Sequence, residues 1–402
     1  MTLDIRYALH HAINIGTICI FAPVIALFCQ HKGMDLSQIG LFFGVYFLAI
    51  ILFELPSGAW ADRFGRLNVF MLSKMLDCLN FALLFYFDYI PALYAASFVG
   101  GIARAMGSGA MEAWYVDQLK KVHRYHLMPS LLSNAHGWAL VAMAFGAVSG
   151  AALVACNLQL PNNNSPYHWV LLVAFTMHLI LGISVPFCFH EGEVKQTIRK
   201  ERSDVNVIKK ILMACIQHPI LKRVLGLQII HGFLLSSIQT YWQPQLLTML
   251  NEKTDVFVFG WVSALFFFSA ALSAAWIKRS HKGLLNNNGR QLLGIFGASS
   301  VLVLLLATTN SALLFIVVYL CFGFAIFAIK PLLAILMHQS IEDHQRATAL
   351  SILSLALNLG GVLVGLALGT IADSAGVRVV WVISGVSGLI FVALLMRVKP
   401  NE

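Results

Sequence analysis

The sequence predicts an all-α membrane protein with twelve transmembrane helices arranged in two six-helix bundles. Of its 402 residues, 59% are hydrophobic and only 11% are charged, which is outside the usual composition of water-soluble domains. Apolar runs of about 20 residues, long enough to cross a bilayer as helices, recur along the chain. Six of them precede the longest polar stretch, residues 190–210, and six follow it.

The placement of the basic residues predicts the topology. Sorting the 27 Lys and Arg by predicted loop puts about 21 on one side of the membrane, about three on the other and about three inside spans. The positive-inside rule makes the crowded side the cytoplasm, so both termini are expected there. The net charge of +9 is therefore attributed to the basic cytoplasmic loops, and no nucleic-acid partner is expected.

Several classes of site are disfavoured by what the sequence lacks. The seven Cys include no CxxC pair, which argues against a zinc site or a disulfide framework. No GxxxxGK[ST] phosphate loop occurs, so the chain is not expected to be an ATP-driven pump. Asp4 and Arg6 lead directly into a run of full spanning length, so the first helix is expected to be retained. We expect no metal, no cofactor and no enzymatic activity.

The spans follow from the apolar runs and the turn signals between them. The linker of residues 190–217 divides a bundle of residues 1–189 from a bundle of residues 218–402. An amphipathic helix on the inner membrane surface is an option for part of it, around Val205–Leu212. The expected spans are 5–28, 36–60, 67–87, 92–119, 127–156 and 169–189 in the first half, and 220–247, 257–277, 292–307, 312–337, 347–371 and 377–396 in the second.

The short turn ELPSGAWADRFGR, residues 54–66, joins the second and third spans. Two glycines in it lack a Cβ, so the helix ends are expected to approach closely. The turn resembles the signature G-x-x-x-D-R-x-G-R of the major facilitator superfamily. The alternative is a tight charged turn in another polytopic protein. The residues that match the signature are Gly58, Asp62, Arg63, Gly65 and Arg66.

Other stretches also resemble this superfamily, including SGAMEAWYVDQL at the end of the fourth span and RATALSILS at the start of the eleventh. The resemblance implies two six-helix bundles, built from inverted three-helix repeats, that rock around a central site. The loop of residues 278–290 keeps positive charge where a second signature would lie, but not its core. In the fifth span, Gly146 and Gly150 form a small-xxx-small pattern typical of close helix packing.

The resemblance also implies a gate at the signature turn. Asp117, at the inner end of the fourth span, is expected to pair with Arg63 or Arg66. Asp62 is expected to face the start of the eleventh helix, which begins at Arg346. The Asp62 contact would form when the cavity opens outward and break when it opens inward, which biases a two-state equilibrium.

Charges inside spans are costly without a partner or water, and therefore mark candidate sites. Arg104 and Lys330 lie on the fourth and tenth spans, which line the central cavity in the resembling family. Two cations from opposing halves would suit a carboxylate or phosphate. The alternative is internal pairing of Arg104 with Glu112 or Asp77, and a Lys330 side chain that extends towards the cytoplasm.

Three carboxylates are candidates for proton coupling: Glu54, Asp77 and Glu112. Desolvation raises the pKa of a carboxyl and suits it to carry a proton. For Glu54 the alternative is a hydrogen-bonded latch to the inner loops. The histidines in or near spans are more often packing residues than proton relays; they are His10, His11, His136, His178, His231 and His338.

The seventh span carries a polar group suited to substrate contact, with interhelical hydrogen bonding as the alternative. Its members are Gln228, His231, Gln239 and Trp242.

We therefore expect a monomeric, proton-coupled secondary transporter of a bacterial inner membrane. The cavity's aromatic and Met content suggests efflux of amphipathic, drug-like compounds. Arg104 and Lys330 suggest instead an anionic metabolite or chelator, such as a carboxylate or siderophore. A non-transporting membrane protein is the distant alternative.

Overall fold

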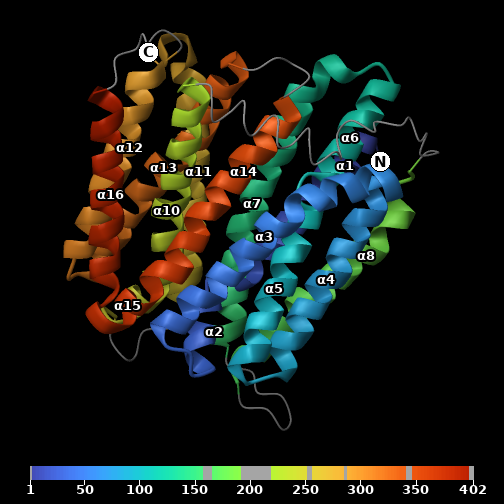
Figure 1. The fold of residues 1–402 in the computed structure, drawn as a ribbon. Coiled ribbons are helices and arrows are strands. Elements are labelled where there is room, and N and C mark those ends of the chain that lie inside the picture. Colours follow the sequence, from blue (N-terminus) through green and yellow to red (C-terminus); the bar gives the residue numbers. More distant parts are fainter. Residues whose placement is uncertain are drawn as a thin grey trace. The chain divides into compact units, whose positions relative to one another are not determined.

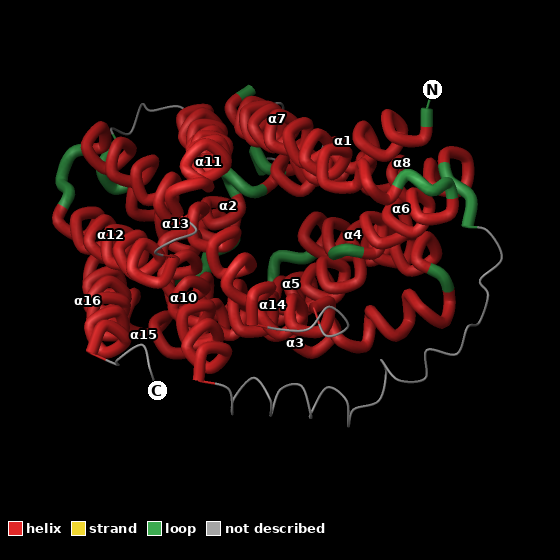
Figure 2. The backbone as a smooth tube through the Cα atoms, turned by 90° about the horizontal axis from the view of Figure 1, so that it is seen from above, coloured by secondary structure: helices red, strands yellow, loops and turns green. Residues whose placement is uncertain are grey.

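The computed structural model describes residues 2–156, 165–191, 219–250, 256–284, 288–340 and 346–397. Across these ranges the chain consists of helices and their connections, without a strand (Figure 2). Eleven helical segments in them are long and apolar enough to cross a membrane. The predicted all-α class is confirmed, and the chain is an integral membrane protein. The linker, with its expected amphipathic helix, lies outside the described residues.

Contacts between residues divide the chain into two compact units. The N-terminal unit comprises Met1–Gly33, Ala49–Ile198 and Lys253–Phe268, and the C-terminal unit comprises Met34–Leu48, Arg199–Glu252 and Ser269–Glu402. Two helices, α3 (Leu36–Phe64) and α11 (Phe257–Leu284), contribute to both units. The domain boundaries expected from the sequence stay a prediction.

In the N-terminal unit, α1 packs along α7 (Figures 1 and 2). A Cβ on Gly150 of α7 would overlap the backbone oxygen of Ile20 on α1, so only glycine permits this approach. The small-xxx-small pattern therefore does mark close packing. Besides its parts of α3 and α11, this unit contains α1 (Leu3–Phe21), α2 (Ile25–His31), α4 (Arg66–Tyr86), α5 (Ile90–Gly107), α6 (Ala110–Lys121), η1 (Tyr125–Leu127), α7 (Met128–Ala155) and α8 (His168–Cys188).

Two spans that were expected to be continuous are interrupted. The first span breaks between α1 and α2 at residues 22–24, where Pro23 has no backbone N–H to continue the helix. The fourth span breaks between α5 and α6, where Ser108 is extended and Gly109 has φ +75°. Three poor helix formers in succession, Gly107 to Gly109, explain this second break.

The C-terminal unit places α12 beside α16 and α10 beside α14 (Figure 1). Trp381 on α16 is one of its large, fully buried side chains, and Nε1 of this residue donates to the Ser237 carbonyl of α10 at 3.0 Å. Besides its parts of α3 and α11, the unit contains α10 (Pro219–Leu247), α12 (Asn288–Thr308), α13 (Ala312–Ser340), α14 (Arg346–Leu363), the π-helical segment η3 (Val364–Leu368), α15 (Gly369–Ala375) and α16 (Val377–Arg397).

Candidate functional site

Within the signature turn, residues 54–66, only Gly65 lies outside a helix, because α3 ends at Phe64 and α4 begins at Arg66. Gly65 is buried and has φ +97° and ψ +142°, a conformation that residues with a side chain rarely adopt. A Cβ at this position would lie 2.5 Å from Oε2 of Glu191. The space without a Cβ at Gly65 is thus occupied by a side chain and not by another helix end, while the unusual dihedrals allowed by a glycine are present. The close approach expected at Gly58 is wrong, because nothing among the described residues lies within 4 Å of a Cβ there.

Arg66, the first residue of α4, holds the turn to α6. Its Nη1 lies 2.7 Å from Oδ2 of Asp117, and it also donates to the Ala113 carbonyl. Its Nη2 lies 3.7 Å from Oδ1 of Asp62. Of the two arginines expected to reach Asp117, the structure selects Arg66; the Arg63 guanidinium lies over the Phe64 ring instead. The gating role of these residues stays a prediction, and the Arg346 side chain lies outside the described residues.

Glu191, which sequence reasoning did not single out, caps the start of α4. Its carboxylate accepts hydrogen bonds from the backbone N–H groups of Arg66, at 2.5 Å, and Leu67, at 3.2 Å. These N–H groups have no partner within the helix, and the positive end of the helix dipole favours an anion. In the sequence, Glu191 is simply a Glu shortly after the sixth span, and nothing distinguishes it from the other charged residues of the linker.

A polar surface gathers on four helices of the N-terminal unit: His11 on α1, Arg104 on α5, Glu112 on α6 and His136 on α7. Nε2 of His136 lies 3.7 Å from Oε2 of Glu112, and the rings of His11 and His136 meet edge to face at 5.2 Å. Arg104 interacts electrostatically with His11. We call these four residues the polar surface. Its two histidines were expected to be packing residues, yet His136 is exposed.

The expected alternative for Arg104, pairing with Glu112 or Asp77, is wrong for the described residues. Glu112 pairs with His136, and Asp77 pairs with Lys74 at 2.6 Å. Arg104 is exposed and makes neither ion pair. The break before α6 turns the chain between Arg104 and Glu112, so counting helical turns across it fails.

Glu54, the remaining proton-coupling candidate, is half-buried on the part of α3 that belongs to the N-terminal unit. One turn later, the buried Ser57 hydroxyl donates to the Glu54 carbonyl at 2.8 Å and lies 3.2 Å from the Ala105 carbonyl of α5. This contact holds α3 against α5.

The four candidates on α10 do not form one open face. Gln228 and His231 are only 3% exposed, and Nδ1 of His231 lies 3.4 Å from Oε1 of Gln228. Further along, the Gln239 amide donates to the Tyr319 hydroxyl at 3.2 Å, and Trp242 stacks on the Tyr319 ring at 5.1 Å. The two contacts with Tyr319 of α13 favour interhelical packing, whereas Gln228 and His231 contact each other within α10. Lys330, on α13, is exposed.

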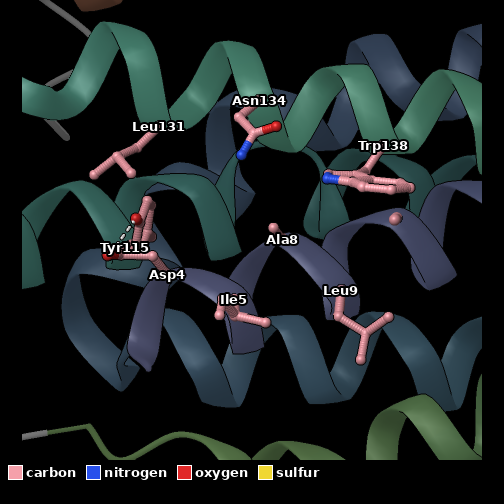
Figure 3. A pocket seen from close by; sticks show the side chains of 9 residues that line it. Asp4, Ile5, Ala8, Leu9, Tyr115, Leu131, Asn134 and Trp138 are labelled. Carbon is pink, nitrogen blue, oxygen red and sulfur yellow. Dashed lines mark hydrogen bonds between the residues drawn. The ribbon is translucent and has the colours of Figure 1, made fainter. Parts of the chain in front are cut away.

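A cavity of about 420 Å³ lies between α1, α6 and α7 of the N-terminal unit. Its walls are mainly apolar, with Ile5 and Leu9 of α1 on one side and Leu131 and Trp138 of α7 on the other (Figure 3). The volume falls in the range of about 300–1,000 Å³ found for small-molecule sites, which are also mostly apolar.

Polar groups stand at defined places in this cavity. At one end, the Tyr115 hydroxyl donates to Oδ1 of Asp4 at 2.7 Å (Figure 3). The other oxygen of Asp4 lies 2.9 Å from Nη2 of Arg124. The Asn134 amide lies on the α7 side, beside Trp138. The cavity therefore offers one neutralised ion pair and one amide among apolar walls.

The family model described as Major Facilitator Superfamily matches residues 8–348. The chain belongs to the major facilitator superfamily. The chain is therefore a secondary transporter, and its substrate is a small molecule.

Curated relatives of this superfamily member include proteins named as transporters. An uncharacterized MFS-type transporter of Bacillus subtilis, YxaM, is 24% identical over 395 residues, which are 95% of this chain and 93% of the relative. The class C tetracycline resistance protein of Escherichia coli is 27% identical over 184 residues, 45% of this chain and 43% of that protein. Among solved structures, the nucleoside transporter NupG has a TM-score of 0.78 at 13% identity and covers 99% of this chain and 100% of its own. This last similarity shows the fold alone.

Proposed function

We propose that this transporter exports amphipathic, drug-like compounds in exchange for protons. It would act as a monomer in a bacterial inner membrane, with both termini in the cytoplasm. Its two halves, residues 1–189 and 218–402, would rock about a central site.

The cavity between α1, α6 and α7 is the observation that carries this proposal. Its apolar walls would bury the hydrophobic body of a ligand, and the Asp4–Arg124 pair and the Asn134 amide would orient its polar groups. The tetracycline resistance relative supports the same class, because its name describes resistance to an amphipathic drug.

Proton coupling is supported by the carboxylates and imidazoles of the N-terminal unit. Glu112 and His136 of the polar surface lie 3.7 Å apart and are both accessible. Glu54 and Asp77 are the other two carboxylates on its spanning helices that we consider as carriers. Each could exchange a proton between two states that differ in hydration.

The signature turn is proposed as the gate. Arg66 would stay bound to Asp117, and Glu191 would hold the start of α4 in place. Asp62 is bound only loosely by Arg66, at 3.7 Å. It is therefore the group that would contact the start of α14, at Arg346, in one state and release it in the other.

A second candidate function is transport of an anionic metabolite or chelator. It is favoured by the exposed Arg104 guanidinium, which has neither of its expected carboxylate partners. Lys330 on the C-terminal unit would supply the second cation, since an anionic group needs charged donors to replace lost water.

A thermal-shift screen on purified protein separates the two functions. We would use ethidium, tetracycline, citrate and glucose 6-phosphate as probes. Export of amphipathic compounds predicts stabilisation by ethidium or tetracycline only. Stabilisation by citrate or glucose 6-phosphate alone would reject the first proposal in favour of the second.

Trp138→Ala tests whether the cavity itself is the ligand site. The variant should lose the shift produced by ethidium or tetracycline, because it removes an aromatic wall of the cavity. Phe145→Ala is the matched control, since Phe145 is an exposed aromatic residue on the same helix outside the cavity. Equal shifts in the two variants would contradict the assignment.

A further inference from the structure

One face of α1 is polar and buried inside the N-terminal unit. Tyr7, His10, Asn14 and Thr17 follow one another at intervals of three and four residues, the spacing of a single helix face. All four are buried. A helix in a bundle usually turns apolar or small residues to this side, so the polar stripe needs a partner.

The partner is an ion cluster contributed by α4 and α8. Nζ of Lys74 donates to Oδ1 of Asn14 at 2.9 Å and to Oδ2 of Asp77 at 2.6 Å. Nδ1 of His178 lies 3.3 Å from the same Asp77 oxygen, but it makes no hydrogen bond to the described residues in this state. We call Asn14, Lys74, Asp77 and His178 the buried ion cluster. It links three helices through one carboxylate.

The buried ion cluster is well shielded from solvent. The side chains of Lys74 and His178 are 3% and 1% exposed, and that of Asp77 is 15% exposed. Gly182 of α8 gives the Lys74 stem its space, since a Cβ there would come within 3.2 Å of Cβ of Lys74. The His178 ring stacks on Phe81 of α4 at 5.5 Å.

A contribution to folding stability does not by itself explain why these charged residues are buried here. Replacing a buried ion pair with well-packed apolar residues is often neutral or stabilising, and ionisable groups within spans generally mark functional sites. Among the described residues, no hydrogen bond or ion pair joins the buried ion cluster to the polar surface, and none of its residues lines the cavity between α1, α6 and α7. We therefore look for a role other than substrate contact.

A line of polar groups leads from the buried ion cluster towards the start of α1. His10 lies one turn before Asn14, with its ring between Phe70 and Phe189. The His10 ring faces the Leu181 backbone, but neither of its nitrogens makes a well-formed hydrogen bond to the described residues. The Tyr7 hydroxyl also makes none to them. Buried polar atoms of this kind are commonly satisfied by internal water.

We propose that the buried ion cluster is the proton-binding site that couples transport, with His178 as the carrier. This inference rests on the proposed proton coupling and adds the site. A proton from water near the start of α1 passes Tyr7 and His10 and binds Nδ1 of His178, where it faces Oδ2 of Asp77. It leaves from the same nitrogen when the transporter changes state.

The shared oxygen of Asp77 explains how proton binding would affect the helices. A protonated His178 forms a charge-assisted hydrogen bond to Oδ2, which is also the acceptor for Lys74. The two cations then compete for one oxygen. The position of the Lys74 ammonium therefore changes, and with it the contact that Lys74 makes from α4 to Asn14 of α1. The titratable groups facing His178 are Lys74 and Asp77 on α4, with His10 further along α1. His11 of the polar surface flanks the same stripe, where its ring stacks on Tyr7 at 5.7 Å, so a shift of α1 reaches that surface.

The test uses the full-length protein in liposomes with ethidium and tetracycline as probes. Two rates are measured: accumulation driven by a pH gradient, and exchange of labelled for unlabelled probe without a gradient. Exchange requires no net proton movement. His178→Gln should reduce accumulation to the level seen without a gradient and retain exchange.

Two controls keep the result interpretable. His168→Gln, at a buried histidine that is the first residue of α8, should retain both rates. If His178→Gln does not fold, the double variant Lys74→Met with Asp77→Leu replaces it, because removing both charges leaves no unpaired charge in the cluster. In this variant, accumulation should again be lost and exchange kept.

Three outcomes would overturn the inference. Unchanged accumulation in His178→Gln shows that the proton binds elsewhere. Joint loss of accumulation and exchange in a folded variant assigns the cluster a structural role. A wild-type protein that moves neither probe under a pH gradient rejects the proposed function itself, and this inference with it.

Discussion

Replacing Gly65 with alanine should destabilise the protein for two separate reasons. The backbone at φ +97° and ψ +142° lies where a residue with a side chain is strained by about 1–3 kcal/mol. The new Cβ would also lie 2.5 Å from the Glu191 carboxylate. Displacing this cap from the start of α4 should cost a further amount of about 0.5–2 kcal/mol. Together we expect a loss of between about 1.5 and 5 kcal/mol.

The free energy of unfolding would be measured in mixed micelles titrated with sodium dodecyl sulfate, with helicity as the signal. Gly58→Ala is the matched control, because its Cβ meets nothing within 4 Å among the described residues. It lies inside α3, where alanine is favoured over glycine by up to about 1 kcal/mol. The two substitutions, seven positions apart in one motif, should therefore have opposite signs.

Glu191→Ala separates the two contributions at Gly65. The single variant loses only the helix cap. In the double variant Gly65→Ala with Glu191→Ala, the new methyl group no longer meets a carboxylate, so the combined loss should be smaller than the sum of the single losses. Gly65→Ala with the stability of Gly58→Ala would refute this explanation of the turn.

Two further predictions concern helix contacts in the N-terminal unit. Gly150→Ala should lower the melting temperature or prevent folding, because its Cβ would overlap the Ile20 backbone, whereas Gly137→Ala, with open space on the same helix, should be tolerated; equal melting temperatures would contradict the close packing. Arg66→Asp should slow probe transport by replacing the 2.7 Å pair with Asp117 by a repulsion. The stability loss should exceed the value of about 1 kcal/mol for a partly exposed pair, because the bond to the Ala113 carbonyl is lost as well. Adding Asp117→Arg should restore part of the transport rate, and no restoration would argue against a direct pair.

The spans were predictable from the sequence because hydrophobic length is a local property. An apolar run of about 20 residues has few alternatives to a membrane helix. Gly65 was predictable for a similar reason, since a glycine between two such runs is where the chain can turn. The break at Ser108 and Gly109 was missed because a short group of small residues inside an apolar run is compatible with either a continuous or a broken helix.

Most of the candidate site could not be found in this way. Glu191 reads as one charge of a polar linker, yet it caps a helix that starts 125 positions earlier. The histidines of the polar surface look like ordinary packing residues until three helices, α1, α6 and α7, bring His11, Glu112 and His136 together.

By itself the sequence determined the class of protein, most of its membrane spans, its signature turn and the superfamily resemblance, because each depends on residues close together in the chain. Only the tertiary structure decided which charges meet. It paired Arg66 with Asp117, left Arg104 without its expected carboxylates, and placed Lys74, Asp77 and His178 around one oxygen. Such contacts join residues on different helices, and their partners depend on how each helix is rotated and where it is broken.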